Sequence, residues 1–223
     1  ACYIPLGHVT GGGDLFGAAE RAPGQMGRDE ALAALKPLLE DESVLKIGQN
    51  MKYDWKIFAR HGIRITPFDD TMLLSYAMQA GLNNHGMDTL SELYLGHQPI
   101  PIKSLLGSGK SQITFDKVAI DDAVKYAAED ADVTLRLWQL FKPQLHRAKV
   151  TTVYETLERP LVPVLADMEM TGIKVDREVL RGMSNVFAQK LVQLEEEIQS
   201  IAGEKFNVGS PKQLGEILFD RLQ

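Results

Sequence analysis

The spacing of apolar residues changes near residue 150, and this change constrains the fold more than any other feature of the sequence. Before it, strands are indicated by short apolar runs at 1–9, 44–48 and 63–68. Helical periodicity occupies the ranges 28–40, 51–61, 71–78, 88–95 and 119–140. Strands that alternate with helices indicate an α/β domain, which we place at residues 1–149.

From Thr151 onward the pattern is helical only. Helices are expected at 153–170 and 177–201. A further helix is expected after Ser210, which can cap it, with Pro211 in the first helical position. We therefore place a second, all-helical unit at residues 150–223.

Composition and chain ends set broader bounds. A chain of 223 residues with 44% hydrophobic content and a net charge of −6 is typical of a soluble globular protein. Its acidity is compatible with an enzyme that binds phosphate groups through metal ions, because such a site is itself rich in carboxylates. The single Cys2 and the lack of an apolar run of ~18 residues favour a cytoplasmic protein without membrane partners. We expect a monomer.

The first residue is not Met and the last residues lie within a helical pattern, so we expect a piece of a longer protein. A glycine-rich loop is expected at 10–17.

The segment YAAEDAD at 126–132 carries three acidic residues on one predicted helix. Successive helical residues are ~100° apart, which places Asp130 ~40° from Tyr126 on the apolar stripe. Glu129 and Asp132 fall on the opposite, polar side. The pattern predicts that Asp130 points toward the core, while Glu129 and Asp132 face solvent.

A second carboxylate also points inward. On the helix expected at 51–61, Asp54 falls beside Met51 and Trp55, whereas Lys52 and Lys56 turn to the other side. Burying one ionised carboxylate alone costs several kcal/mol or more, so an inward Asp requires a cation or a dense set of donors.

The inward pair indicates a metal site. A lone inward Asp is best explained by a neighbouring Arg or by backbone amides. Two such acids repel each other, and this repulsion is most simply relieved by divalent cations bound between them. Aspartate without Cys or paired His favours Mg²⁺ or Mn²⁺. Tyr126, one turn before Asp130, would place a phenol at the same site, where it could orient a water. Asp69 and Asp70 are explained as caps of the helix at 71–78.

KIGQNMKYD (46–54) and YAAEDADVTL (126–135) together resemble the second and third exonuclease motifs of the bacterial DNA polymerase I family, family A of the DNA polymerases. The likeness continues through FDDTMLLSYAM and GMDTLSELYL. The stretches ERPLVPVLADMEMTGIKVD and FNVGSPKQLGEILF look like the start of that family's polymerase domain, at the base of its thumb.

The resemblance implies a proofreading 3'-5' exonuclease domain on a ribonuclease-H-like α/β fold, followed by an all-helical segment from the thumb base. Asp54 and Asp130 would be two of four carboxylates that bind two divalent cations, Mg²⁺ or Mn²⁺, and Tyr126 would position the attacking water. The residues bordering the site and the DNA would be Gln49, Asn50, Lys52 and Tyr53. The implied partners are the 3' end of single-stranded DNA and the rest of the polymerase domain in cis, in a bacterial, nucleoid-associated protein.

Two departures from the family pattern qualify this expectation. The opening Asp-x-Glu motif of the first strand does not occur in residues 1–25. We therefore expect a domain whose first strand is missing, with half of the metal ligands, weak metal affinity and little or no nuclease activity in the isolated chain. Asn84 stands where relatives can have an Arg that contacts DNA.

Two alternatives stay open at this point. The α/β domain could be a non-catalytic spacer of a family A polymerase, although Asp54, Tyr126 and Asp130 are retained. It could also be an RNA-trimming exonuclease of the same fold, which the thumb-like tail disfavours.

Overall fold

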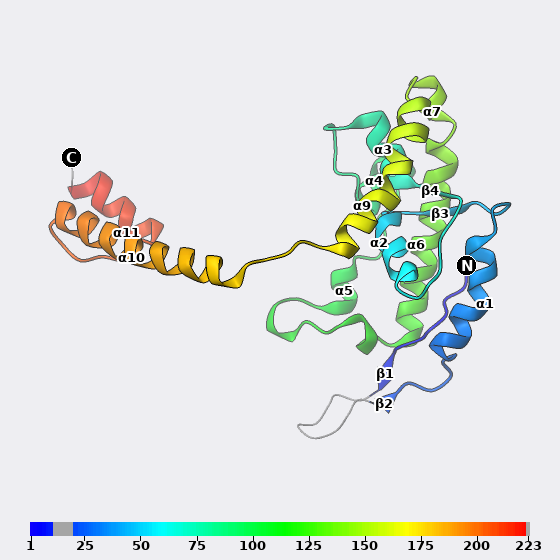
Figure 1. Cartoon of the computed structure of the whole chain (residues 1–223), viewed down its shortest axis with the longest axis horizontal. Coiled ribbons are helices and arrows are strands. Elements are labelled where there is room, and N and C mark those ends of the chain that lie inside the picture. Colours follow the sequence, from blue (N-terminus) through cyan, green and yellow to red (C-terminus); the bar gives the residue numbers. More distant parts are fainter. Residues whose placement is uncertain (11–19, 222–223) are drawn as a thin grey trace. The chain divides into compact units, whose positions relative to one another are not determined.

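A computed structural model describes residues 1–10 and 20–221 of the chain (Figure 1). It contains two compact units, Ala1–Thr171 and Gly172–Gln223. The sequence pattern placed the boundary at 149/150, whereas the first unit extends to Thr171. The difference arises because helical periodicity does not reveal which core a helix packs against.

The sheet of the first unit is small. β3 (Lys46–Gly48) and β4 (Phe68–Asp70) pair in parallel, with Gly48 opposite Asp70. β1 (Val9–Thr10) and β2 (Glu20–Arg21) form a separate antiparallel pair. The parallel pair therefore ends at Gly48 and Asp70, side by side.

All three expected strands differ in their bounds from the observed strands, which begin at Val9, Lys46 and Phe68. Residues 1–8 are not in a strand, and neither are residues 63–67. Pro67 has no N–H to give to a ladder, and its carbonyl accepts the N–H of Lys46 at 3.0 Å, so the strand begins at Phe68. The loop expected at 10–17 lies, from residue 11 on, outside the described residues.

All five helices expected before residue 149 are present within a few residues of their predicted ends. The helical elements of the first unit are α1 (Arg28–Glu40), α2 (Met51–Ala59), α3 (Thr71–Gln79), α4 (Met87–Leu95), α5 (Ile102–Leu106), η1 (Gly109–Ser111), η2 (Phe115–Lys117), α6 (Ile120–Phe141), α7 (Gln144–Arg147), α8 (Thr151–Val153), the π-helical η3 (Tyr154–Glu158) and α9 (Arg159–Thr171).

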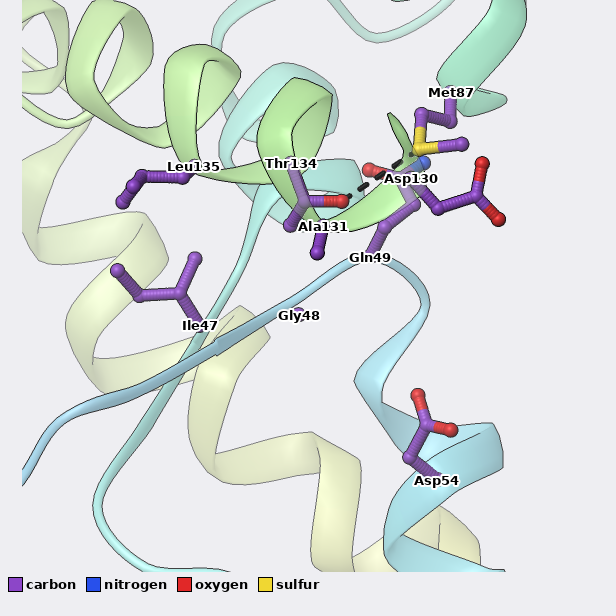
Figure 2. Close-up of a pocket in the computed structure, with 9 residues that line it drawn as sticks. All are labelled: Ile47, Gly48, Gln49, Asp54, Met87, Asp130, Ala131, Thr134 and Leu135. Carbon is purple, nitrogen blue, oxygen red and sulfur yellow. Dashed lines mark hydrogen bonds between the residues drawn. The ribbon is translucent and has the colours of Figure 1, made fainter. Parts of the chain in front are cut away.

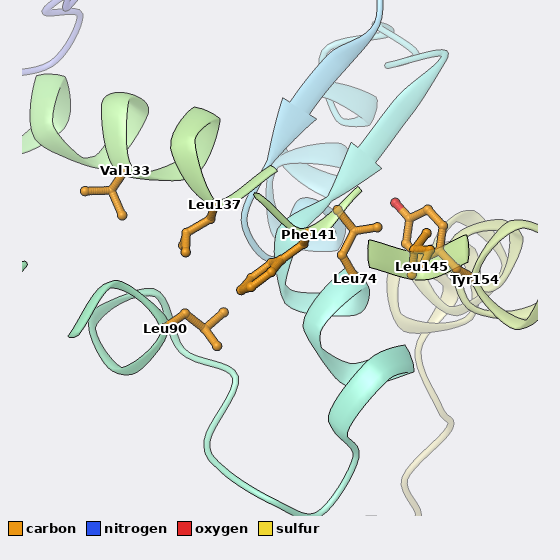
Figure 3. Close-up of a cluster of buried hydrophobic side chains, with 7 residues drawn as sticks. All are labelled: Leu74, Leu90, Val133, Leu137, Phe141, Leu145 and Tyr154. Carbon is orange, nitrogen blue, oxygen red and sulfur yellow. The ribbon is translucent and has the colours of Figure 1, made fainter. Parts of the chain in front are cut away.

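One apolar cluster joins α3, α4, α6 and α7, and Tyr154 of η3 completes it (Figure 3). Its buried members are Leu74, Leu90, Val133, Leu137, Phe141, Leu145 and Tyr154. Full burial of each large apolar side chain stabilises the fold by roughly 1.5–3 kcal/mol. This cluster fixes the apolar side of α6, the helix that carries Asp130.

A second cluster packs α9 against α2. Met51 and Trp55 of α2 meet Val162 and Ala166 of α9, and the cluster also includes buried Ile65 and Phe68. Residues 151–171, which the sequence pattern assigned to the second unit, therefore complete the core beneath α2.

The second unit contains α10 (Arg177–Ala202), α11 (Pro211–Glu216) and the π-helical η4 (Ile217–Arg221). The Ser210 hydroxyl accepts the N–H of Gln213 and Pro211 takes the first helical position, as predicted. None of the helices in the described part of the chain is long and apolar enough to cross a membrane.

Candidate active site

The corner between β3 and α2 positions several of the predicted site residues. Gln49 and Asn50 form this corner, and Asn50 adopts left-handed backbone angles (φ 58°, ψ 48°), which Asn tolerates better than most residues. The buried carboxylate of Asp70 accepts the N–H groups of Asn50 at 3.0 Å and Met51 at 2.9 Å. The end of β4 therefore holds the first turn of α2.

A pocket of about 440 Å³ lies where this corner faces α6. Its lining residues are Ile47, Gly48, Gln49, Asp54, Met87, Asp130, Ala131, Thr134 and Leu135 (Figure 2). Three predicted site residues, Gln49, Asp54 and Asp130, thus border one space, although they come from two helices and a turn.

Asp54 is exposed, which corrects the prediction that it points into the core. It lies on the first turn of α2, between Met51 and Trp55, which pack against α9 and are buried while Asp54 is not. Helical periodicity gave its direction but could not show that this direction opens into a pocket. Partial desolvation, and then the negative charge of Asp70, raise the pKa of Asp54.

Asp130 is half-buried on α6, in line with the helical periodicity. Its Oδ1 atom is buried and has no hydrogen-bond partner within the described residues. Burial raises the pKa of Asp130 to about 6; the Tyr126 hydroxyl opposes this rise, and the charges of Asp88 and Glu129 add to it. A carboxyl oxygen in this state is available as a ligand.

Tyr126 lies one turn before Asp130 but does not line the pocket. Its ring packs near that of Phe115, with centroids 6.1 Å apart. Burial, followed by the charge of Asp130, raises the pKa of Tyr126 to about 12. The phenol therefore remains protonated at neutral pH and can donate a hydrogen bond.

The predicted DNA contacts are distributed over several places. The Gln49 amide donates to the His85 carbonyl at 2.9 Å and accepts from the Thr71 hydroxyl, so it is held beside the carboxylates. Asn50 and Lys52 border a second pocket of about 150 Å³, between α2, α3 and α9.

The cationic groups of α2 are already paired. Lys52 Nζ and Lys56 Nζ each lie 2.5 Å from a carboxylate oxygen of Glu169 on α9. Tyr53, between them in the sequence, is 61% exposed. The ion pairs draw Lys52 toward α9, whereas the aromatic ring of Tyr53 is free to meet a ligand.

Glu129 does not face solvent, which corrects the prediction for it. Its side chain is only 20% exposed. One carboxylate oxygen lies 2.8 Å from His97 Nε2 and the other accepts the N–H of Ile100 at 2.6 Å. The segment after α4 folds over this face of α6, a contact across about thirty residues that periodicity cannot reveal. Asp132 is exposed, as predicted.

Asp69 has a structural role that the sequence pattern missed. It is fully buried and accepts hydrogen bonds from Trp138 Nε1 (2.8 Å), the Tyr154 hydroxyl (2.9 Å), Arg159 (3.1 Å) and Lys142 (3.1 Å). Burial alone would raise the pKa of Asp69, but these donors hold it below its ordinary value. Only Asp70 caps α3, through the N–H of Met72. One helix start needs one cap, so the presence of two adjacent aspartates was the signal that could have indicated a different role for Asp69.

The donor set fits part of the coordination shell of a divalent cation. Within residues 1–10 and 20–221, no three His, Cys, Asp or Glu side chains form a group that could hold a metal. Asp54 and Asp130 nevertheless border the same pocket, and Asp130 Oδ1 is a free oxygen donor of the kind that Mg²⁺ and Mn²⁺ prefer.

Two bacterial proteins are similar to this chain in sequence. DNA polymerase I of Rhizobium leguminosarum is 58% identical over 222 residues, which cover 100% of this chain and 22% of that protein. DNA polymerase I of Pseudomonas aeruginosa is 44% identical and is matched over 24% of its length. The chain thus spans about a quarter or less of these relatives.

Solved structures show a similar fold. The POL domain of Pol1 from M. smegmatis, in complex with DNA primer-template and dNTP, matches 93% of this chain and 33% of that chain with a TM-score of 0.66 at 26% identity. Brucella melitensis NrnC matches 62% of this chain and 64% of its own, with a TM-score of 0.52 at 22% identity, which shows likeness of fold alone.

Two protein families match the chain. DNA polymerase family A matches residues 177–223. The family described as 3'-5' exonuclease matches residues 19–146, more than half of the sequence. The chain therefore belongs to the 3'-5' exonuclease family and continues into a segment of DNA polymerase family A.

Proposed function

We propose that this chain supplies the metal-dependent 3'-5' exonuclease domain of a proofreading DNA polymerase, which removes nucleotides from the 3' end of single-stranded DNA. One observation carries the proposal: in a chain of this family, a buried oxygen of Asp130, which has no hydrogen-bond partner in the described part of the chain, lies on the α6 side of a pocket that Asp54 also borders. The parallel β3–β4 pair packed among helices is consistent with a ribonuclease-H-like fold.

Asp54 and Asp130 are the residues that would hold divalent cations. Two bound Mg²⁺ or Mn²⁺ ions supply activation of water and neutralisation of charge on the leaving 3' oxygen. Burial raises the pKa of Asp130, so its ionised form is the one that a bound cation would stabilise. The protonated phenol of Tyr126 would orient the attacking water by donating a hydrogen bond.

The 3' end of the DNA would be held by the corner and first turn of α2. Gln49 borders the carboxylate pocket and is fixed by Thr71 and His85. Tyr53 offers an exposed ring on which a base can stack, a contact worth roughly 1–3 kcal/mol per base. Asn50 would donate a hydrogen bond to the DNA. Lys52 would leave its ion pair with Glu169 and contact a phosphate of the DNA instead.

The match of residues 177–223 to DNA polymerase family A supports a polymerase domain in cis. We infer that the whole protein is a DNA-directed DNA polymerase, and that it acts as a cytoplasmic, nucleoid-associated monomer. Residues 1–223 alone are expected to bind metal weakly, because the described part provides two pocket-facing carboxylates.

Cleavage of end-labelled oligonucleotides tests the proposal. The substrate is 5'-labelled single-stranded DNA with Mg²⁺ or Mn²⁺, and the enzyme is the full protein that carries this sequence. Asp130→Asn should lower the rate by roughly 100-fold or more. Asp132→Asn is the matched control, since it makes the same charge change at an exposed position of the same helix.

Three results would contradict the proposal. Equal rates for Asp130→Asn and the unchanged protein would exclude Asp130 from the site. Absence of metal-dependent cleavage would favour the non-catalytic spacer. Faster cleavage of a matched RNA strand than of DNA would favour an RNA-trimming enzyme.

A further inference from the structure

We propose that Tyr154 is a positioning residue for the exonuclease site and acts through Asp70 on the first turn of α2. The inference rests on the proposed function, because the positioned residues are those assigned to metal and DNA. It concerns a residue that lies outside both family matches, 19–146 and 177–223.

Tyr154 connects two consecutive buried acids. It is fully buried at the end of the apolar cluster that includes Leu145 (Figure 3). Its hydroxyl accepts the backbone N–H of Asp70 at 3.0 Å and donates to Asp69 Oδ1 at 2.9 Å. Lys142 lies over its ring, 5.0 Å from the centroid, which further fixes the orientation of the ring.

Asp70 passes this restraint to the site. Its Oδ1 atom accepts the N–H groups of Asn50 (3.0 Å) and Met72 (2.9 Å), and its Oδ2 atom accepts the N–H of Met51 (2.9 Å). The residue is 2% exposed, so water cannot replace these bonds readily. Its backbone is held by Tyr154, and its carboxylate in turn holds the start of α2.

The position of Asp54 depends on this restraint. Asp54 lies in the first turn of α2, three residues after Met51, and Gln49 lies one residue before Asn50. Displacement of Asp70 would therefore shift two pocket residues together. A left-handed Asn50 offers no side-chain cap of its own, so the turn relies on Asp70.

A purely space-filling role for Tyr154 predicts a different outcome. The ring alone would serve the apolar cluster, and Phe would replace it with little change in volume. Loss of the hydroxyl leaves Asp69 with its bonds from Trp138, Lys142 and Arg159, but removes the tyrosine partner of the Asp70 N–H. Tyr154→Phe therefore affects Asp70 more specifically than it affects the core.

Amide hydrogen exchange on the full chain separates the two roles. Tyr154→Phe should speed exchange at the N–H groups of Asn50 and Met51 by roughly 10-fold, the equivalent of one lost hydrogen bond. Asp70→Asn should produce the same local change. Leu145→Val is the control, because it removes a methylene from the same cluster without touching Asp70.

In the full protein, Tyr154→Phe should lower kcat for 3' cleavage several-fold with a smaller change in KM, whereas Leu145→Val should change neither. Unchanged exchange at Asn50 and Met51, or an increase no larger than the loss of global stability produces, would overturn the inference. Asp130→Asn distinguishes the two proposals: full cleavage by that variant refutes the proposed function, while amide exchange still tests the coupling of Tyr154 to α2.

Discussion

The Asp70 carboxylate accepts the backbone N–H of Met51 at 2.9 Å, so a residue of β4 caps α2 from nineteen positions further along the chain. The residue that precedes α2, Asn50, makes no side-chain cap bond itself. The helix that carries Asp54 thus starts at a point set by tertiary contact.

Replacement of Asp70 should destabilise the chain. Asp70→Ala leaves the N–H groups of Asn50, Met51 and Met72 without their acceptor, but it also removes a buried charge whose pKa is raised by burial. We expect a net loss of about 2–3 kcal/mol in the free energy of unfolding, measured by urea denaturation. Asp176→Ala removes an exposed cap of α10 and should cost about 1 kcal/mol. Equal losses for the two variants would contradict the tertiary cap.

Replacement of Asp69 should have a larger effect. Asp69→Ala removes the acceptor of Trp138 Nε1 and of the Tyr154 hydroxyl proton, while Lys142 keeps its bond to Glu155. We expect a loss of roughly 3–5 kcal/mol, because a buried charge network is broken on one side. Asp132→Ala, which removes an exposed carboxylate, should change stability by less than about 0.5 kcal/mol. A loss below about 1 kcal/mol for Asp69→Ala would contradict the claim that the hydrogen bonds to Asp69 stabilise the fold.

Asp130 should make stability depend on pH. Its pKa in the folded chain is about 6, above the ordinary value of 3.8, so between these values the folded state binds more protons than the unfolded state. Stability therefore falls as pH rises from about 4 to 6, and stays lower above that range. In EDTA, Asp130→Asn should raise the free energy of unfolding at pH 7.5 by on the order of 1–2 kcal/mol.

The gain from Asp130→Asn should disappear at pH 4 and should shrink when Mn²⁺ is added at pH 7.5. Thermal and urea unfolding at both pH values measure it, with Asp132→Asn as control. A gain that is independent of pH would mean that burial of the Asp130 charge is not its source.

Release of Lys52 and Lys56 should strengthen DNA binding. Glu169→Gln removes the carboxylate that pairs with both lysines, so we expect a several-fold lower Kd for a single-stranded oligonucleotide at low salt, which fluorescence anisotropy measures. The pairs are partly exposed, so stability should change little. Glu178→Gln makes the same charge change at an exposed pair with Arg181 and should leave Kd nearly unchanged. A Kd that shifts equally in both variants would reflect net charge alone.

The sequence by itself determined the features that depend on near neighbours. The repeat of apolar residues predicted α6 and the direction of Asp130, since both follow from the 3.6-residue turn. The caps at Asp70 and Ser210 were equally local, because each side chain bonds an amide two or three residues ahead. The motifs around Asp54 and Asp130 were sufficient to indicate the family.

Only the tertiary structure decided which faces are covered. Glu129 is shielded because the segment at His97 folds over it, and Asp54 is open because α9 covers only part of α2. Tyr154 joins Asp69 and Asp70 from about 85 residues away. Helical periodicity reports a direction around one axis, and whether that direction meets solvent, a pocket or another helix depends on loop closures that no short window of sequence contains.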